Sequence, residues 1–100
     1  MSYLIAYQPR AIREYEAAAL WYKERSMQAA ENFEIAVNKK INILRLNPLR
    51  YRNTYKEFRE IQLDKYPFNI IYLVDENKLK VIISSIYHHK RNPKKKFKRQ

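Results

Sequence analysis

Residues 78–99 read KLKVIISSIYHHKRNPKKKFKR, and the rest of the chain can be understood from this stretch outward. Positions 79–86 are largely apolar, which predicts a strand in the middle of a sheet, because a strand buried on both faces has no polar alternation. Tyr87, His88 and His89 follow, and a run of cations comes next. We therefore expect one strand to carry titratable and basic side chains out of the core to a functional edge.

Two more strands are predicted immediately upstream. Residues 68–75 are apolar at nearly every position, whereas residues 59–64 alternate between apolar and polar. Residues 75–78 form the turn before the last strand, and since the chain has no glycine, we expect Asn77 to adopt the left-handed conformation there. The polar segment 49–56 mixes Tyr and Arg and is expected to be a loop or an irregular edge.

Two amphipathic helices are predicted between a first strand at 3–7 and these later strands. Pro9 suits the first turn of a helix, where its missing N–H costs nothing, and Ser26 can cap a second helix. The apolar face expected for the first helix consists of Ile12, Tyr15, Ala17, Ala19, Leu20, Trp21 and Tyr22. The stripe expected for the second consists of Ala30, Phe33, Val37, Ile41 and Leu44. Pro48 ends this helix because proline disfavours helical geometry in the residue before it, Asn47.

The order of these elements predicts an α+β fold. An N-terminal strand is followed by an antiparallel helix hairpin, since only two or three residues separate the helices, and then by a three-stranded antiparallel meander. One sheet with both helices on one face follows from this order. At 100 residues the chain has room for one hydrophobic core, so we expect a single domain.

Charge is distributed unevenly along the chain. The net charge is +11, of which residues 1–50 contribute +3 (8 Lys and Arg against 5 Asp and Glu) and residues 51–100 contribute +8 (13 against 5). The cations of the C-terminal stretch, which contains no acidic residue, are Lys90, Arg91, Lys94, Lys95, Lys96, Lys98 and Arg99. They are the predicted binding site for a polyanion, either nucleic acid or an acidic protein. The alternative is a solvated tail that only aids solubility.

Composition excludes several kinds of site. There is no cysteine, so disulfides and thiolate metal sites are impossible, and the absence of glycine excludes glycine-rich phosphate loops. His88 and His89, without a spaced Asp/Glu cluster, fall short of zinc ligand spacing, so we expect neither a metal nor a cofactor. No run approaches about 20 apolar residues and the N-terminus is unlike a signal peptide, so we expect a cytoplasmic protein with no membrane contact.

The residues at the strand end permit two interpretations. Histidine titrates near neutral pH, so Tyr87 and His88 could supply acid–base groups for metal-independent RNA cleavage. Arg59 and Lys65 could then stabilise the phosphoryl transition state. Adjacent histidines point to opposite faces of a strand, so at most one of them lines a given site. The alternative is that they are structural or contact a partner. The fourteen aromatic residues likewise either stack on bases or fill the core.

Four segments in this order resemble the RelE/ParE superfamily of toxins from bacterial toxin–antitoxin modules. They are Ala18–Tyr22 (AALWY), Leu44–Pro48 (LRLNP), Phe58–Tyr72 (FREIQLDKYPFNIIY) and Tyr87–Pro93 (YHHKRNP). The resemblance covers nearly the whole chain, and the closing His-x-x-Arg-Asn-Pro pattern is similar to the ParE-like branch. It implies a toxin domain over residues 1–93 and a basic tail over residues 94–100.

The resemblance also implies a growth inhibitor that a cognate acidic antitoxin neutralises in a hetero-oligomer, with Trp21 and Tyr22 as candidate antitoxin contacts. ParE-type members inhibit DNA gyrase without being enzymes, whereas RelE-type members cleave messenger RNA on the ribosome with basic residues and a C-terminal Tyr or His. For the RelE branch, the carried-over catalytic residues are Arg59, Lys65, Tyr87 and His88. Asn69 stands where many members, including the ribonucleases, have an arginine, and the loss of this cation weakens the ribonuclease hypothesis. A basic nucleic-acid-binding domain without toxicity is the third hypothesis.

Overall fold

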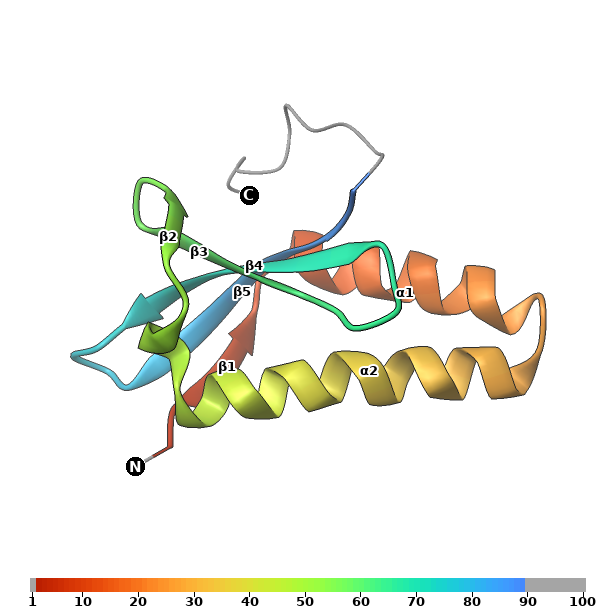
Figure 1. Ribbon diagram of the computed structural model, residues 1–100, viewed down its shortest axis with the longest axis horizontal. Coiled ribbons are helices and arrows are strands. Elements are labelled where there is room, and N and C mark those ends of the chain that lie inside the picture. The colour runs from red at the N-terminus through yellow and green to blue at the C-terminus, as the bar shows by residue number, and fades with distance from the viewer. Residues whose placement is uncertain (1, 90–100) are drawn as a thin grey trace.

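The computed structural model describes residues 2–89 of the chain. Its elements, shown in Figure 1, are β1 (Leu4–Tyr7), α1 (Pro9–Lys23), α2 (Met27–Leu46), the one-turn 3-10 helix η1 (Pro48–Arg50), β2 (Asn53–Tyr55), β3 (Phe58–Gln62), β4 (Phe68–Asp75) and β5 (Lys80–His88). Both predicted helices and all four predicted strands are present. β2 is an addition, and it lies within the segment that was expected to be a loop or an irregular edge.

The five strands form one mixed sheet in the order β1-β5-β4-β3-β2. β1 runs parallel to β5, and the remaining pairs are antiparallel. β2 pairs with β3 in an irregular register at the outer edge. The predicted α+β fold, with its helix hairpin and its meander of β3, β4 and β5, is therefore confirmed.

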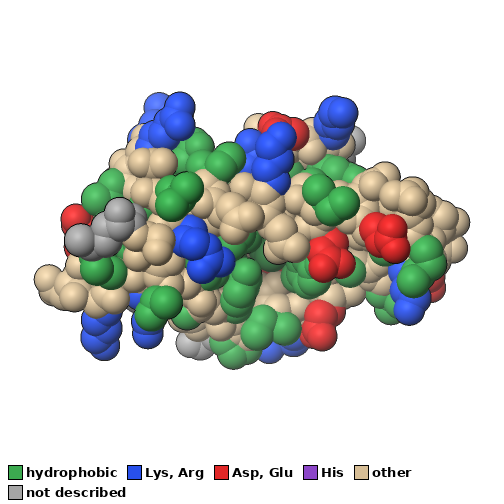
Figure 2. Space-filling model, turned by 90° about the horizontal axis from the view of Figure 1, so that it is seen from below, with side chains coloured by type: hydrophobic (Ala, Val, Ile, Leu, Met, Phe, Trp, Pro, Cys, Tyr) green, Lys and Arg blue, Asp and Glu red, His purple; other side chains and the backbone are tan. Residues whose placement is uncertain are grey.

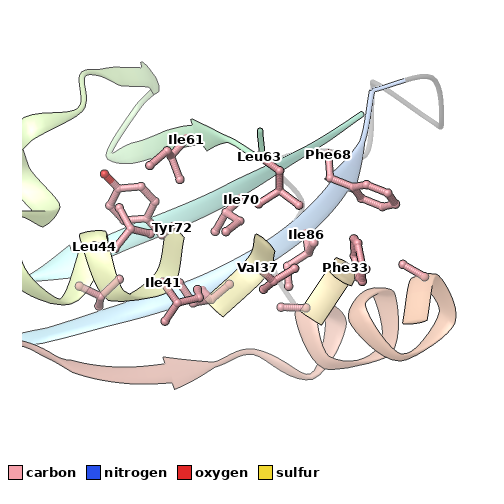
Figure 3. Packing of buried hydrophobic residues seen from close by; sticks show 14 residues of the cluster. Phe33, Val37, Ile41, Leu44, Ile61, Leu63, Phe68, Ile70, Tyr72 and Ile86 are labelled. Carbon is pink, nitrogen blue, oxygen red and sulfur yellow. The ribbon is translucent and has the colours of Figure 1, made fainter. Parts of the chain in front are cut away.

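The main hydrophobic core lies between α2 and one face of the sheet. The stripe predicted for α2 is buried at Phe33, Val37, Ile41 and Leu44, and only Ala30 is partly exposed. Figure 3 shows these side chains directed at residues of three strands and at Leu63, which follows β3. The strand residues are Ile61, Phe68, Ile70, Tyr72 and Ile86. Spacing of three and four residues gives a helix a single apolar face, so this packing follows directly from the sequence.

The face predicted for α1 is correct only in part. Ala11 and Ala18 are the buried residues of this helix, whereas Ile12 and Leu20 are 45% and 58% exposed, and Ala17 and Trp21 are exposed as well. Tyr15, Ala19 and Tyr22 do pack against the core. Because α1 lies against both α2 and β5, small alanines rather than the larger apolar residues mark its line of closest approach.

Local signals at the helix ends and turns are mostly confirmed. Pro9 begins α1, and the Ser26 hydroxyl accepts a hydrogen bond of 2.9 Å from the backbone N–H of Ala29 at the start of α2. In the turn between β4 and β5, the Asp75 carboxylate accepts a hydrogen bond from the Lys78 N–H at 3.1 Å. Leu79, with φ of 50°, adopts the left-handed conformation, so the prediction for Asn77 was wrong.

A β-bulge in β5 determines which residues point to which face. Ser85 pairs with Ile71 and Ile83 pairs with Tyr72, so Ser84 is an extra residue on β5. Just beyond it, β1 has ended and leaves the backbone N–H of Ile86 without a neighbouring strand. Glu14 of α1 fills this position, because its carboxylate accepts hydrogen bonds from the Ile86 N–H at 3.1 Å and the Ser85 hydroxyl at 2.7 Å.

Candidate functional site

The face of the sheet that the helices do not cover carries a short apolar row, which we call the open-face row. Its residues are Phe58, Ile71, Leu73 and Tyr87, from β3, β4 and β5. These residues alternate along their strands with residues of the main core, so their side chains point away from α2. Phe58, Ile71 and Tyr87 are buried and Leu73 is partly buried.

A hydrogen-bonded chain of three polar side chains lies on the same face. The Asn69 side-chain amide donates to the Glu60 carboxylate, and its oxygen lies 2.5 Å from Nε2 of His89. A carboxylate only accepts hydrogen bonds, so the amide nitrogen must face Glu60 and the amide oxygen must face His89. His89 therefore donates from Nε2. The backbone N–H of His89 donates to the Pro67 carbonyl at 2.9 Å, and this bond holds the backbone of His89 next to Asn69.

The four residues predicted as catalytic are not brought together on this face. Tyr87 lies on it, directly opposite Asn69 in the β4–β5 register. His88 points to the helix side, where its ring lies edge-on to Phe68 with centroids 5.0 Å apart. Lys65 is exposed in the β3–β4 turn, with φ of 67°.

Arg59 also points to the helix side. Its guanidinium donates to the backbone carbonyls of Tyr51 and Leu49, so it holds η1 and the residue after it against the sheet. Alternation with Ile61 was the available signal for this orientation, and the same alternation places Glu60 on the open face. Sequence reasoning missed Glu60 and His89 as neighbours of Asn69 because their meeting depends on the register of three strands.

Among the described strand residues, positive charge is scarce on the open face. Within β3, β4 and β5, the one Lys or Arg that alternation places there is Lys80, which lies opposite Asp75 in the β4–β5 register. Lys56 and Lys65 lie in turns rather than in the strands. The predicted polyanion site, Lys90 to Arg99, lies outside the described residues.

The two candidate antitoxin contacts differ in environment. The Tyr22 ring packs between Phe33 and Tyr66, with centroids at 4.9 and 5.5 Å, and is part of the core. Trp21 is 43% exposed, and the Arg25 guanidinium lies 3.2 Å above the centre of its ring. Arg25 also donates to the Trp21 carbonyl at 2.8 Å, so Trp21 and Arg25 form one stacked surface near the end of α1.

Two hollows lie on the surface formed by the described residues, and the larger one reaches Leu73 of the open-face row. A groove of about 350 Å³ lies between α2 and the β3–β4 turn, lined by Asn32, Ile35, Ala36, Lys39, Asp64, Lys65 and Tyr66. One of about 520 Å³ lies around the β4–β5 turn, and its lining includes Glu57, Asp75 and Glu76. On the side of the molecule that α2 presents, basic, acidic and hydrophobic side chains are interspersed (Figure 2).

Two kinds of feature are not found in the part of the chain that the structure describes. Residues 2–89 contain no group of three or more His, Asp or Glu side chains placed to hold a metal ion. Over the same residues, no helix is long and apolar enough to span a membrane.

Comparison with known proteins identifies the family. Residues 5–93 match the model of the ParE toxin of the type II toxin–antitoxin system parDE. The chain belongs to the ParE toxin family. The superfamily resemblance found in the four sequence segments is thereby confirmed, and this ParE-family chain is a toxin of the type II toxin–antitoxin class. Among curated proteins, none matches it in sequence.

Solved structures support the same fold for this ParE-family toxin. The chromosomal ParDE system from P. aeruginosa has a TM-score of 0.73 at 13% identity, covering 87% of this chain and 96% of that one. A free E. coli RelE double mutant has a TM-score of 0.61 at 18% identity, covering 90% and 86%. The RelBE2 toxin–antitoxin complex from Mycobacterium tuberculosis has a TM-score of 0.59 at 17% identity, covering 88% and 99%. At these identities the structural similarity supports the fold alone.

Proposed function

We propose that this toxin inhibits growth by binding a protein target, either DNA gyrase or another protein, and that it is not an enzyme. The observation that carries the proposal is the composition of the open face. Cleavage of RNA requires cations that stabilise the charge of the phosphoryl transition state. Within β3, β4 and β5, Arg59 is directed to the helix side, Asn69 is neutral and Lys80 is opposite Asp75. Within these three strands, the open face presents Glu60 and the opposed Lys80 and Asp75 but no cluster of cations, and this composition suits protein recognition better than RNA cleavage.

A cognate antitoxin is the second part of the proposal. The family model names a toxin of a type II module, and one of the similar structures is a toxin–antitoxin complex. The net charge of +11 would attract an acidic partner and speed its association. Trp21, with the Arg25 guanidinium stacked on it, has the residue types that dominate protein interfaces. A hetero-oligomer in the cytoplasm is therefore expected, and a short acidic reading frame beside this gene would be the antitoxin.

The gyrase hypothesis is tested with a supercoiling assay. Purified toxin added to gyrase, relaxed plasmid and ATP should inhibit supercoiling in proportion to its concentration, and prior addition of the protein encoded by the neighbouring gene should restore the reaction. Heat-unfolded toxin serves as the control for non-specific effects of a basic protein on DNA. If folded toxin arrests growth in cells but leaves supercoiling unchanged, gyrase is not its target.

A RelE-type ribonuclease is the alternative, and one arrangement favours it. The chain of Glu60, Asn69 and His89 places a carboxylate and an imidazole on one face beside Tyr87, and such a pair can act in acid–base catalysis. Ribosomes translating a defined messenger RNA would then yield discrete cleavage products when the toxin is added. His89→Ala should abolish them, whereas His88→Ala, which changes the other face, should not. An intact message with the wild-type toxin excludes this mechanism.

A further inference from the structure

Residues 49–56 (LRYRNTYK), which we call the basic strip, combine cations and tyrosines at one edge of the sheet. Arg50 ends η1, Arg52 and Lys56 flank β2, and all three side chains are exposed. The strip contains no acidic residue. Figure 1 shows β2 at the edge of the sheet opposite to β1. Within residues 2–89 no further strand pairs with β2, so the strip is open on its outer side.

Two tyrosines alternate with these cations. Tyr55 is 45% exposed, and the Lys56 ammonium lies 5.3 Å from the centre of its ring. Tyr51 is partly buried and packs against the main core, and the Arg50 guanidinium lies 5.9 Å from the centre of its ring. Each ring therefore has a cation beside it, and Tyr55 presents aromatic surface and positive charge at the same place.

The turn after β2 holds Lys56 in an unfavourable backbone conformation. Its φ of 50° lies in the left-handed region, which costs a residue with a Cβ atom more than it costs glycine. The Asn53 side-chain amide donates to the Lys56 carbonyl at 3.1 Å and closes the turn. A lysine kept in such a conformation is a candidate for a function of its side chain. Its ammonium group is the one beside Tyr55, so strain and charge coincide at the exposed ring.

Protection of the sheet edge explains only part of this composition. A short, irregular strand flanked by charges prevents another strand from pairing with it, and Arg52 and Lys56 serve that purpose. Edge protection requires neither Arg50 nor an exposed aromatic ring. Cations that follow a phosphate backbone, together with aromatic rings on which bases stack, are typical of surfaces that bind single-stranded nucleic acid.

Nearby carboxylates limit where such a strand can lie. Glu57, Asp75 and Glu76 line the hollow around the β4–β5 turn, which also reaches Asn53. Carboxylates repel phosphates, so the strand would follow the outer side of β2 and not enter the hollow.

We infer that the basic strip binds an unpaired strand of nucleic acid, with Arg50, Arg52 and Lys56 on its phosphates and a base stacked on Tyr55. The strip contains no histidine and no acidic residue, so it has no pair of acid–base groups and binds without cleaving. It is separate from the hydrogen-bonded polar chain of the open face. The inference goes beyond the proposed function and does not depend on the identity of the protein target.

Stacking is tested with the full-length toxin and labelled strands of about 12 thymidines or uridines, a length within the usual site sizes. Tyr55→Leu should weaken binding by roughly fivefold or more, because it removes the ring and keeps an apolar side chain. Tyr7→Leu is the matched control, since Tyr7 is 43% exposed at the opposite edge, and should leave the affinity unchanged. Equal affinities for Tyr55→Leu and wild type, or equal binding of a duplex, would overturn the inference. The thymidine and uridine strands show whether DNA or RNA is preferred.

A second pair of variants separates binding from stability. Lys56→Gly removes the cation without lowering the stability, because relief of the left-handed conformation offsets the greater freedom of glycine in the unfolded chain. It should lower the slope of log affinity against log salt by roughly 0.7. Lys65→Gly makes the same change at φ of 67° in the β3–β4 turn and should leave the slope unchanged. If Lys56→Gly and wild type have the same slope, the lysine contacts no phosphate and the inference is wrong.

Cross-linking distinguishes the basic strip from the C-terminal cations, which would attract any polyanion. A strand that carries 5-iodouracil is irradiated with the wild-type toxin, and the linked peptide is identified by mass spectrometry. Cross-links at Tyr55 support the site. Cross-links confined to residues 90–100 would show that the C-terminal stretch alone binds the strand and would refute the inference.

Discussion

The two faces of the sheet are built from alternate residues of the same strands, but they are held in different ways. On the helix side, Ile70 and Tyr72 of β4 belong to the large cluster that α2 covers. On the open face, Ile71 packs only with Phe58, Tyr87 and Leu73, and Asn69 links Glu60 to His89. One face therefore carries the main core, and the other combines a small buried apolar cluster with the polar chain of Glu60, Asn69 and His89.

Consecutive isoleucines of β4 provide the most direct test of this difference. Ile70 and Ile71 are both 0% exposed and point to opposite faces. Ile70→Ala should lower the free energy of unfolding by about 4 kcal/mol, because a rigid core leaves a cavity, and Ile71→Ala by about 2 kcal/mol, because a small cluster can collapse. Urea unfolding of both variants measures the two losses. Equal losses would show that the two faces are equally well packed and would contradict the difference between them.

Glu14 is expected to have the next largest effect, because it holds the bulge that sets the faces of β5. Glu14→Ala leaves the Ile86 N–H and the buried Ser85 hydroxyl without their acceptor, which should cost about 2 to 3 kcal/mol. Glu16→Ala on the same helix is the matched control, since Glu16 is exposed, and should change stability by less than about 0.5 kcal/mol. Loss of similar size in both variants would mean that Glu14 contributes only helix propensity.

Much of this fold could be predicted because its signals are local. The apolar run 79–86, the stripe of α2, Pro9 at the first position of α1 and the Ser26 cap each depend on a few neighbouring residues. The bulge could not be predicted, because it depends on Glu14 meeting Ser85, 71 positions later in the chain. Without the bulge, alternation does not tell which of Tyr87 and His88 faces outward.

The site was predicted less completely than the fold, for a related reason. Alternation with Ile61 would have placed Glu60 outward and Arg59 inward, and this signal was present in the sequence. The chain through Asn69 to His89 required the β3–β4 and β4–β5 registers together. A site on this face is built from side chains of several strands, so a motif within one strand cannot predict its geometry.

Tyr72 tests the helix side through a polar group rather than an apolar one. Its hydroxyl donates to the Pro48 carbonyl at 2.8 Å and is buried, so Tyr72→Phe should lower the free energy of unfolding by about 1 kcal/mol at neutral pH. Burial raises the pKa of Tyr72, and the nearby Arg59 opposes this rise in part. The folded state therefore keeps its proton above about pH 10, where an unfolded tyrosine ionises.

The sign of the pH effect follows from that difference. The wild-type protein should lose stability as the pH rises above about 10, by up to about 1.4 kcal/mol per pH unit for this group, and Tyr72→Phe should lack that component. Unfolding curves between pH 8 and 11 measure it, with exposed Tyr55→Phe as the control. Parallel pH profiles for wild type and Tyr72→Phe would show that the hydroxyl is not held by burial.

His89 gives the smallest effect on stability and the most specific information on the open face. Because the Glu60 carboxylate orients the Asn69 amide, neutral His89 should carry its proton on Nε2, which a correlation of imidazole proton and nitrogen shifts detects. Asn69→Ala should release this preference and produce a mixture of tautomers, while stability changes by less than about 1 kcal/mol. Gln62→Ala, opposite Asn69 in the register, is the control and should leave the tautomer unchanged. A single Nε2–H tautomer that persists in Asn69→Ala would mean that another group orients His89, and the polar chain would then have no bearing on an acid–base role for this face.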